Sequence, residues 1–141
     1  MASEAQKPLP DRQDIDTGAF WEGTERGELR VKRCEACARH HWPPRRGCPH
    51  CGSGALTWEA VSPTGKVFSW TVVHRSQTPG FEQEVPYAVV LVALDDAPGV
   101  RMVGNLRDCA PDRIAASMPV EAVFTPSADG SVKLVHWRPK G

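Results

Sequence analysis

Apolar and polar residues alternate over several short segments of the chain, which is the pattern of half-buried β-strands. The alternation predicts strands over residues 28–33, 56–61, 66–74, 100–106, 120–124 and 132–137. Residues 87–94 are apolar almost without interruption, which predicts a buried strand. A short helix is expected ahead of all these strands, with Asp16 or Thr17 as N-cap, an end near Arg26 and Gly27 as its stop.

Turn signals separate the predicted strands and keep each of them short. Residues 62–65, 95–99 and 128–131 have the composition of turns, and residues 108–117 are expected to form a short helix or turn. Gly104 interrupts one strand and predicts a bulge or a sharp bend. Short strands that end in a hairpin are typical of a small closed β-barrel, and the OB-fold is the commonest barrel of about 80–90 residues. The pattern indicates this class and leaves the exact topology open.

Two Cys-x-x-Cys pairs interrupt the pattern: Cys34 with Cys37, and Cys48 with Cys51. Four thiolates at this spacing can close a tetrahedral site around one zinc ion, because each pair bends into a tight knuckle. Gly52 can take the positive φ that the exit from such a knuckle often needs. We therefore predict a structural Zn²⁺ site that has no open position for a substrate or a water.

Other uses of these side chains fit the sequence less well. Disulfides are disfavoured because nothing marks the chain as secreted, and a redox pair would need one Cys-x-x-Cys beside a βαβ unit. His40, His41 and His50 are alternative ligands, but four cysteines already fill the site. Each of these histidines is therefore expected to be solvated or hydrogen-bonded.

Length and charge restrict the class of protein further. The chain has 141 residues, with 17 Lys and Arg against 17 Asp and Glu, so the basic excess of a typical nucleic-acid-binding domain is missing. It has no run of 18 apolar residues for a membrane span, and residues 1–10 lack the apolar core of a signal peptide. We expect a cytoplasmic protein with a flexible arm (1–13), an N-terminal helix with a zinc ribbon (14–54) and an OB-fold β-barrel (55–141).

A few polar and aromatic residues are candidates for function. Arg45 and Arg46 follow two consecutive prolines, which hold them on a stiff ribbon. They are either two solvated arginines or a clamp for phosphate or carboxylate groups. Phe20 and Trp21 either pack on the neighbouring module or dock on a partner protein.

A convincing catalytic set is not visible in the sequence. Cys109 is a single thiol on an expected loop, without an obvious histidine partner nearby in the sequence. His74 and His136 are expected at strand ends, and each lacks the third group that orients a catalytic histidine. We therefore expect a chain without catalytic residues.

A series of short motifs runs in order from about residue 14 to residue 139. They are Phe20-Trp21, Gly27-Glu28-Leu29-Arg30, the two cysteine pairs with Pro43-Pro44-Arg45 between them, residues 65–74, Val85-Pro86-Tyr87, Gly99-Val100-Arg101, Gly104-Asn105-Leu106, Met118-Pro119-Val120 and Trp137-Arg138-Pro139. In this order they resemble a bacterial and archaeal family of zinc-ribbon plus OB-fold proteins associated with acyl-CoA enzymes, long filed as a domain of unknown function. Ala38 departs from the family pattern, because a glycine is common there.

The resemblance implies a mainly β fold made of an N-terminal helix, a rubredoxin-like zinc ribbon and a C-terminal OB-fold barrel. It also implies a non-catalytic accessory subunit that stabilises a thiolase-superfamily partner, including sterol-carrier-type thiolases, and helps to shape its acyl-CoA site. Such complexes run retro-aldol cleavage, thiolysis or acyl transfer, as in steroid side-chain degradation. A 2:2 assembly around a thiolase dimer is expected by analogy. Arg45 and Arg46 become candidates for contacts with the CoA phosphates, by charge and rigidity.

Two other functions stay open at this point. Members of the same family also pair with hydratase-fold subunits, although the lack of a fused hydratase domain favours a thiolase-type partner. A single-stranded nucleic-acid-binding OB module is the other alternative, with Phe68, Trp70 and Tyr87 able to stack on bases. The balanced charge of the chain disfavours this second alternative.

Overall fold

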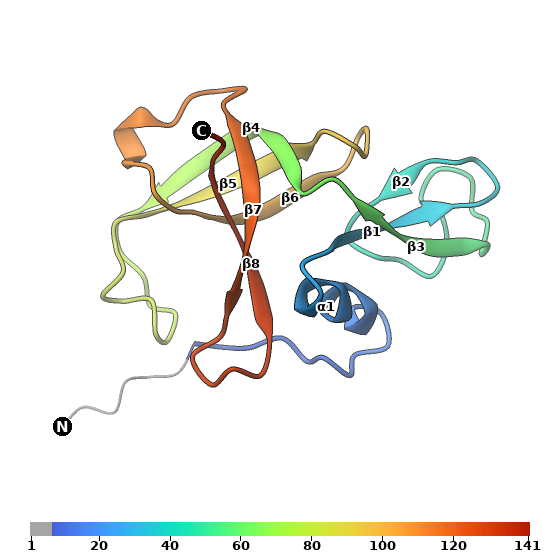
Figure 1. Cartoon of the computed structure of the whole chain (residues 1–141), viewed down its shortest axis with the longest axis horizontal. Helices are drawn as coiled ribbons and strands as arrows, with labels where there is room; N and C mark the ends of the chain where they lie inside the picture. The colour runs from blue at the N-terminus through green and yellow to red at the C-terminus, as the bar shows by residue number, and fades with distance from the viewer. Residues whose placement is uncertain (1–6) are drawn as a thin grey trace.

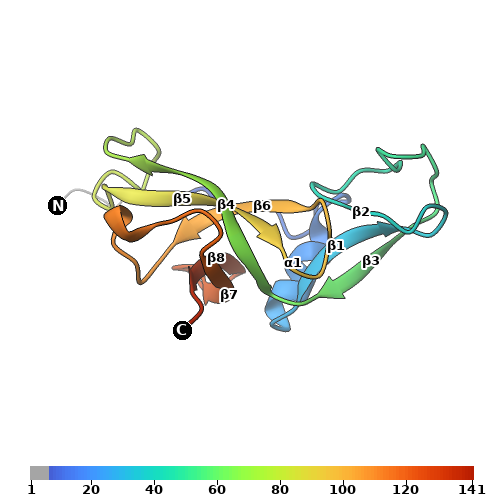
Figure 2. The same cartoon turned by 90° about the horizontal axis from the view of Figure 1, so that it is seen from above.

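The computed structural model describes residues 7–141 and contains one α-helix, a three-stranded sheet and a closed five-stranded barrel (Figure 1). The sheet and the barrel lie toward opposite ends of the long axis, and the helix lies between them (Figure 2). The elements are α1 (Gly18–Glu25), β1 (Leu29–Cys34), β2 (His40–His41), β3 (Leu56–Val61), β4 (Thr64–Val73), β5 (Tyr87–Leu94), β6 (Arg101–Leu106), the 3-10 turn η1 (Pro111–Arg113), β7 (Pro119–Pro126) and β8 (Lys133–Pro139). The mainly β fold predicted from the sequence is confirmed.

The helix begins and ends where its capping residues predict. Thr17 is the N-cap, Arg26 is the C-cap, and Gly27 takes a positive φ of 72° directly afterwards. A left-handed residue after the C-cap is the usual way in which a helix stops, and glycine adopts it without steric cost.

β1 is the central strand of the ribbon sheet. It pairs antiparallel with β3 from Leu29 opposite Val61 to Cys34 opposite Leu56, and with β2 on its other edge. Residues 56–61 lie beyond the predicted domain boundary at residue 55, yet they complete the ribbon sheet and not the barrel. The strands of the barrel therefore begin with β4, while the boundary itself stays a prediction.

The barrel closes in the order β4-β5-β6-β8-β7, and β7 returns to β4. Neighbouring strands are antiparallel except for β6 and β8, which pair in parallel. Five strands closed into a small barrel are the architecture of an OB-fold.

The bulge of the barrel lies in β4 and not at Gly104. The register between β4 and β5 shifts between Val67 and Ser69, so that Phe68 is the extra residue. β6 pairs with β5 through Gly104 without a shift, and the bulge predicted at this glycine is absent. Glycine is needed there for another reason, because the side chain of Trp137 packs against its α-carbon.

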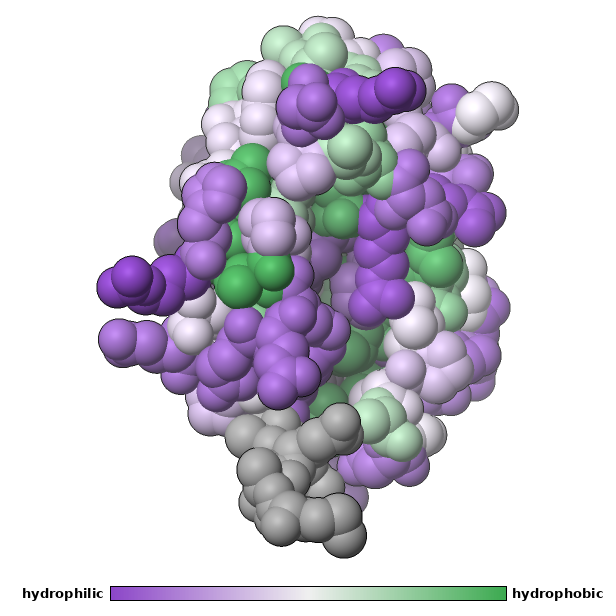
Figure 3. All heavy atoms as spheres, turned by 90° about the vertical axis from the view of Figure 1, so that its left-hand side faces the viewer, coloured by the Kyte–Doolittle hydropathy of each residue, from purple (hydrophilic) through white to green (hydrophobic). Residues whose placement is uncertain are grey.

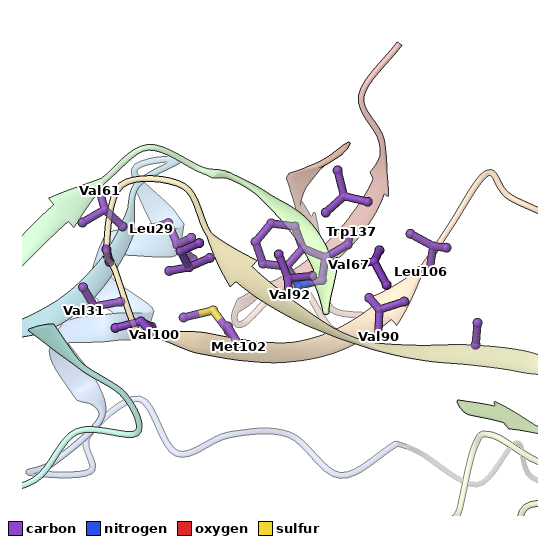
Figure 4. Packing of buried hydrophobic residues seen from close by; sticks show 14 of the residues in the cluster. Leu29, Val31, Val61, Val67, Val90, Val92, Val100, Met102, Leu106 and Trp137 are labelled. Carbon is purple, nitrogen blue, oxygen red and sulfur yellow. The ribbon is translucent and has the colours of Figure 1, made fainter. Parts of the chain in front are cut away.

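One hydrophobic core extends from the ribbon sheet into the barrel (Figure 4). Trp137 is fully buried within it, and Phe20 joins it from α1. The core also includes Leu29, Val31, Val61, Val67, Val90, Val92, Val100, Met102 and Leu106. Burial of each large apolar side chain stabilises the fold by about 1.5–3 kcal/mol, so the core is the main source of its stability.

The segment before the helix is attached to the barrel at two points. Lys7 Nζ lies 2.6 Å from Glu84 Oε1, and Arg12 donates a hydrogen bond to the carbonyl of Ser131. The flexible arm predicted over residues 1–13 lies partly outside the described residues, which begin at residue 7, and it stays a prediction. Of the helix or turn predicted over residues 108–117, only η1 is helical.

The surface on the left-hand side of Figure 1 is mainly hydrophilic, with smaller hydrophobic patches between the polar groups (Figure 3). Over residues 7–141, no helix combines the length and the apolar character that a bilayer crossing would require.

Candidate metal centre

The first cysteine pair lies where β1 ends and the chain turns back toward β2. The N–H of Ala38 donates to the carbonyl of Cys34 over 2.8 Å, and the N–H of Cys34 donates to the carbonyl of Arg39 over 2.9 Å. Ala38 takes a positive φ of 64° to close this turn. For a residue with a Cβ this conformation costs about 1–2 kcal/mol.

The second pair repeats the same backbone pattern. The N–H of Gly52 donates to the carbonyl of Cys48 over 2.9 Å, and the N–H of Cys48 donates to the carbonyl of Ser53 over 2.8 Å. Gly52 has a φ of 79°, as its place after the pair predicted. Ala38 and Gly52 thus hold equivalent positions in two similar knuckles, and the alanine is accommodated without loss of the turn.

The two knuckles bring four sulfur atoms together. The Sγ atoms of Cys34, Cys37, Cys48 and Cys51 all lie within 4.8 Å of one another. Two of the separations are 3.6 Å, between Cys34 and Cys51, and 3.7 Å, between Cys37 and Cys48. A zinc ion bonded to four thiolates at about 2.3 Å would place its ligands about 3.8 Å apart, so the cluster fits a tetrahedral zinc site.

The backbone around the cluster favours the thiolate form of two ligands. The N–H of Cys37 stabilises the Cys34 thiolate and lowers the pKa of Cys34 below its ordinary value. Burial acts to raise the pKa of Cys48, but the N–H groups of His50 and Cys51 outweigh it and lower this pKa to about 6. The N–H of Ser53 acts to lower the pKa of Cys51, but burial and the neighbouring cysteine sulfurs outweigh it and raise this pKa to about 11. Since a thiolate and not a thiol binds metal, binding of a cation would release the proton of Cys51.

The neighbouring histidines do not join the four sulfurs, since the group of metal-binding side chains found within residues 7–141 consists of the cysteines alone. His40 Nε2 lies 3.2 Å from Glu59 Oε2 across the ribbon sheet. His41 is buried, and this burial lowers its pKa. Neither of its ring nitrogens has a hydrogen-bond partner among the described residues, so the expectation of a solvated or hydrogen-bonded side chain is wrong for His41. A Cys₄ site with all positions filled holds structure and leaves no position for a substrate.

Arg45 and Arg46 lie on the loop between the knuckles, and both are exposed. Arg46 Nε donates to Asp16 Oδ1 over 2.8 Å, and its Nη2 lies 3.4 Å from Asp16 Oδ2. This two-point contact with a carboxylate raises the pKa of Arg46 and shows that its guanidinium can bind an oxyanion. Asp16 is a partner that the sequence analysis did not find, because it lies thirty residues away in the chain.

The aromatic residues of the first helix pack against the ribbon. The ring centroid of Phe20 lies 4.8 Å from that of Trp21 and 4.5 Å from that of Trp42, which in turn lies 6.5 Å from Trp58. Of the two roles open for Phe20 and Trp21, packing on the neighbouring module is therefore the one the structure supports.

Three side chains that the sequence analysis considered for catalysis, Cys109, His74 and His136, are distant in sequence from the four cysteines. Cys109 donates a weak hydrogen bond to the carbonyl of Ala110. His74 is exposed and follows the end of β4, whereas His136 lies inside β8 and is buried, so its predicted place at a strand end is wrong. Arg107 Nη2 lies 3.2 Å from His136 Nε2, and burial together with this positive charge lowers the pKa of His136 to about 4.

Comparison with known proteins agrees with this architecture. Residues 21–57 match the model of the ChsH2 rubredoxin-like zinc ribbon domain, and residues 58–125 match that of the ChsH2 C-terminal OB-fold domain. A DUF35 domain-containing scaffold protein from Methanothermobacter thermautotrophicus is 33% identical over 71% of this chain and 74% of its own length. The chain belongs to the DUF35 family.

Two longer proteins are also similar to this chain. A probable enoyl-CoA hydratase alpha subunit from Thermomonospora curvata is 41% identical over 99% of this chain, and the 3-oxo-4,17-pregnadiene-20-carboxyl-CoA hydratase alpha subunit from Mycobacterium tuberculosis is 37% identical over 88% of it. The chain spans only 43% and 38% of the lengths of these two relatives.

A solved structure, an Ltp2-ChsH2(DUF35) aldolase, contains a chain that is 35% identical to this one. The two superpose with a TM-score of 0.79 over 92% of this chain and 98% of the other. A DUF35 protein from Sulfolobus solfataricus, of unknown function and 13% identical, shares the fold with a TM-score of 0.60. The zinc ribbon and the OB-fold predicted from the sequence are confirmed, and the four-cysteine cluster in a ribbon of this family is consistent with structural Zn²⁺.

Proposed function

We propose that this chain is a non-catalytic accessory subunit of a thiolase-superfamily enzyme that acts on acyl-CoA, as a retro-aldolase or an acyltransferase. The observation that carries the proposal is the match to a chain of an Ltp2-ChsH2(DUF35) aldolase. That chain is 35% identical to this one, and the match covers 98% of the aldolase chain. In this role the chain stabilises a thiolase-fold partner, in a 2:2 assembly, and helps to shape the acyl-CoA site.

The metal centre serves this role by holding the ribbon in shape. Zinc, when bound, ties the end of β1 to the loop that carries Arg45 and Arg46. We propose these two arginines as contacts for the CoA phosphates, since both are exposed and Arg46 already binds a carboxylate at two points. The use of four thiolates as metal ligands supports a place in a reducing compartment, the cytoplasm.

A hydratase-fold partner is the second candidate. It is favoured by the two relatives named as hydratase alpha subunits, which match this chain over most of its length. The architecture of this chain would be the same in both complexes, and the chemistry would come from the partner.

Co-expression separates the two candidates. The full chain is co-expressed with the thiolase-fold subunit of its host and, separately, with a hydratase-fold subunit. Native mass spectrometry then measures the mass of any complex that forms. A complex of 2:2 mass with the thiolase-fold subunit, with retro-aldol or acyl-transfer activity, supports the proposal. Turnover by this chain alone, or a stable complex with the hydratase-fold subunit only, would overturn it.

A nucleic-acid role is tested with the same protein. Binding to single-stranded oligonucleotides that weakens steeply with salt would contradict the accessory role, because phosphate contacts release counterions.

A further inference from the structure

Strand β5 is apolar on both of its faces, although only one of them lines the core of the barrel. Along the strand, buried residues alternate with half-buried ones. The inward set includes Val90 and Val92, which are fully buried, while Val89 and Leu91 point outward. The solvated face of an antiparallel strand normally carries polar residues, so the outer face of β5 has the composition of a covered surface.

The neighbouring strands extend this apolar surface. Val103 pairs with Leu91 across β5 and β6 and is 61% exposed, and Trp70 of β4 is 39% exposed. Trp70, Val89, Leu91 and Val103 line a shallow groove of about 290 Å³. We call this groove, together with Phe68 on β4, the β5 face. Exposed apolar side chains gathered in one patch mark a site of interaction.

The charged side chains on the strands of this surface are all basic. Strands β4, β5 and β6 carry Lys66 and Arg101 and no carboxylate. Lys66 Nζ lies 2.9 Å from Asp95 Oδ1 in the turn after β5 and is therefore balanced. Arg101 instead stacks on Phe68, with 3.8 Å from Cζ to the ring centroid. It is absent from the ion pairs found within residues 7–141. The groove thus has an unbalanced positive charge on its rim.

This charge restricts what can cover the β5 face. A second copy of the chain packed symmetrically would bring two Arg101 side chains to one interface that has no carboxylate of its own. A nucleic acid would need several free basic groups for its phosphates, but Arg101 is the one basic side chain on β4, β5 and β6 that lacks a carboxylate partner in the described part of the chain. A protein surface with an apolar centre and carboxylates around it satisfies both the shape and the charge.

We propose that the β5 face docks the enzyme subunit of the complex, through an apolar patch of that subunit ringed by carboxylates, one of which pairs with Arg101. This inference rests on the proposed function and adds to it the surface of this chain that carries the partner.

Titration calorimetry of the full zinc-loaded chain against the purified thiolase-fold subunit of its host tests the docking surface. Val103→Asp and Leu91→Asp place a carboxylate in the apolar centre and are expected to weaken binding by at least about tenfold. Ile15→Asp is the matched control, because Ile15 is 84% exposed outside the β5 face and should bind like the wild type. Arg101→Glu should weaken binding more than Arg101→Ala, and Arg101→Ala should reduce the salt dependence of the affinity.

The outcomes separate the surface from the function. If the wild type binds the subunit and both Asp variants on the β5 face bind equally well, the docking surface is wrong and the accessory role stands. If the wild type does not bind the subunit, the proposed function fails and the inference falls with it. If the wild type alone forms a dimer that Val103→Asp dissociates, the occupant is a second copy and the proposal is overturned. Circular dichroism and zinc content identify any variant that has failed to fold, and Arg101→Ala then provides the decisive comparison.

Discussion

Gly104 lies directly against the indole of Trp137: a Cβ at this glycine would come within 2.8 Å of Cδ1 and 2.9 Å of Nε1. Trp137 is fully buried in the shared core, so its ring has little room to move away. A methyl group at position 104 must therefore displace either the indole or the β6 backbone.

Replacing Gly104 by alanine is expected to destabilise the protein by about 1–3 kcal/mol, the usual cost of overpacking a closed core. Urea denaturation of the zinc-loaded protein measures the effect. Gly54→Ala is the control, since a Cβ there meets nothing within 4 Å. Equal unfolding midpoints for the two variants would show that the contact tolerates a methyl group.

The equivalent positions of Ala38 and Gly52 predict opposite effects of exchanging their residue types. Ala38→Gly should stabilise the protein by about 0.5–1 kcal/mol, because glycine adopts a positive φ without strain, although it adds entropy to the unfolded chain. Gly52→Ala should destabilise it by about 1 kcal/mol, since a Cβ there has free space but an unfavourable φ. Thermal unfolding of both variants tests the pair, and a loss of stability in Ala38→Gly would contradict it.

The metal centre predicts one zinc ion for each chain, which plasma mass spectrometry of the purified protein can count. Cys34→Ser and Cys48→Ser should each lose the metal and lower the melting temperature, because each removes one of four thiolate ligands. Cys109 lies outside the cluster, so Cys109→Ser should retain the metal. Full zinc occupancy in either ligand variant would contradict the assignment of the site.

Buried His136 predicts a loss of stability in acid. Its pKa is lowered to about 4 in the folded protein by burial and by Arg107, whereas a histidine in the unfolded chain has a pKa of about 6.5. Between these values the unfolded state binds a proton that the folded state does not. The free energy of unfolding should therefore fall as the pH is lowered from about 7 to about 4, by up to about 3 kcal/mol from this residue.

Two variants isolate this histidine from other acid-sensitive groups such as the thiolates. His136→Gln cannot take up the proton and should lose this part of the pH dependence, while His74→Gln on the exposed loop should keep it. Denaturant unfolding at pH 5 and pH 7 gives the comparison. The same slope in all three proteins would mean that His136 is protonated in the fold as easily as outside it.

The CoA-binding role proposed for Arg45 and Arg46 predicts an effect on substrate affinity alone. In the assembled enzyme, Arg45→Ala and Arg46→Ala should raise KM for acyl-CoA by about fivefold each and leave kcat unchanged, since a phosphate remote from the reacting bond contributes to binding only. Arg26→Ala is the control, because this exposed arginine pairs with Glu22 on the helix. An unchanged KM in both test variants would remove the arginines from the site.

The parts of the fold that depend on local sequence were predictable. The knuckles follow from the spacing of the cysteines, and the strands follow from alternation that each segment carries within itself. The metal ligands could be predicted without knowledge of the tertiary structure. A spacing of two residues between the cysteines of a pair already allows both sulfurs to bind one ion.

The features that the sequence analysis missed depend on contacts between distant segments. β3 alternates like any strand of the barrel, and only its pairing with β1 assigns it to the ribbon. Gly104 looks like a bulge signal, and only the position of Trp137 explains it. The burial of His136 inside β8 also has no local signal, because it depends on the groups that the fold packs against that strand.

β1 carries the metal site and the core on one six-residue strand, with Cys34 at one end and Leu29 and Val31 buried toward the other. A strand of this length behaves as one stiff element. Unfolding of the ribbon would therefore also disturb the apolar side chains that β1 contributes to the shared core. Zinc affinity and barrel stability are thus thermodynamically linked, and metal bound at one end of the molecule adds to the unfolding free energy of the other. We therefore expect the folded fraction of the chain to rise with the concentration of free zinc.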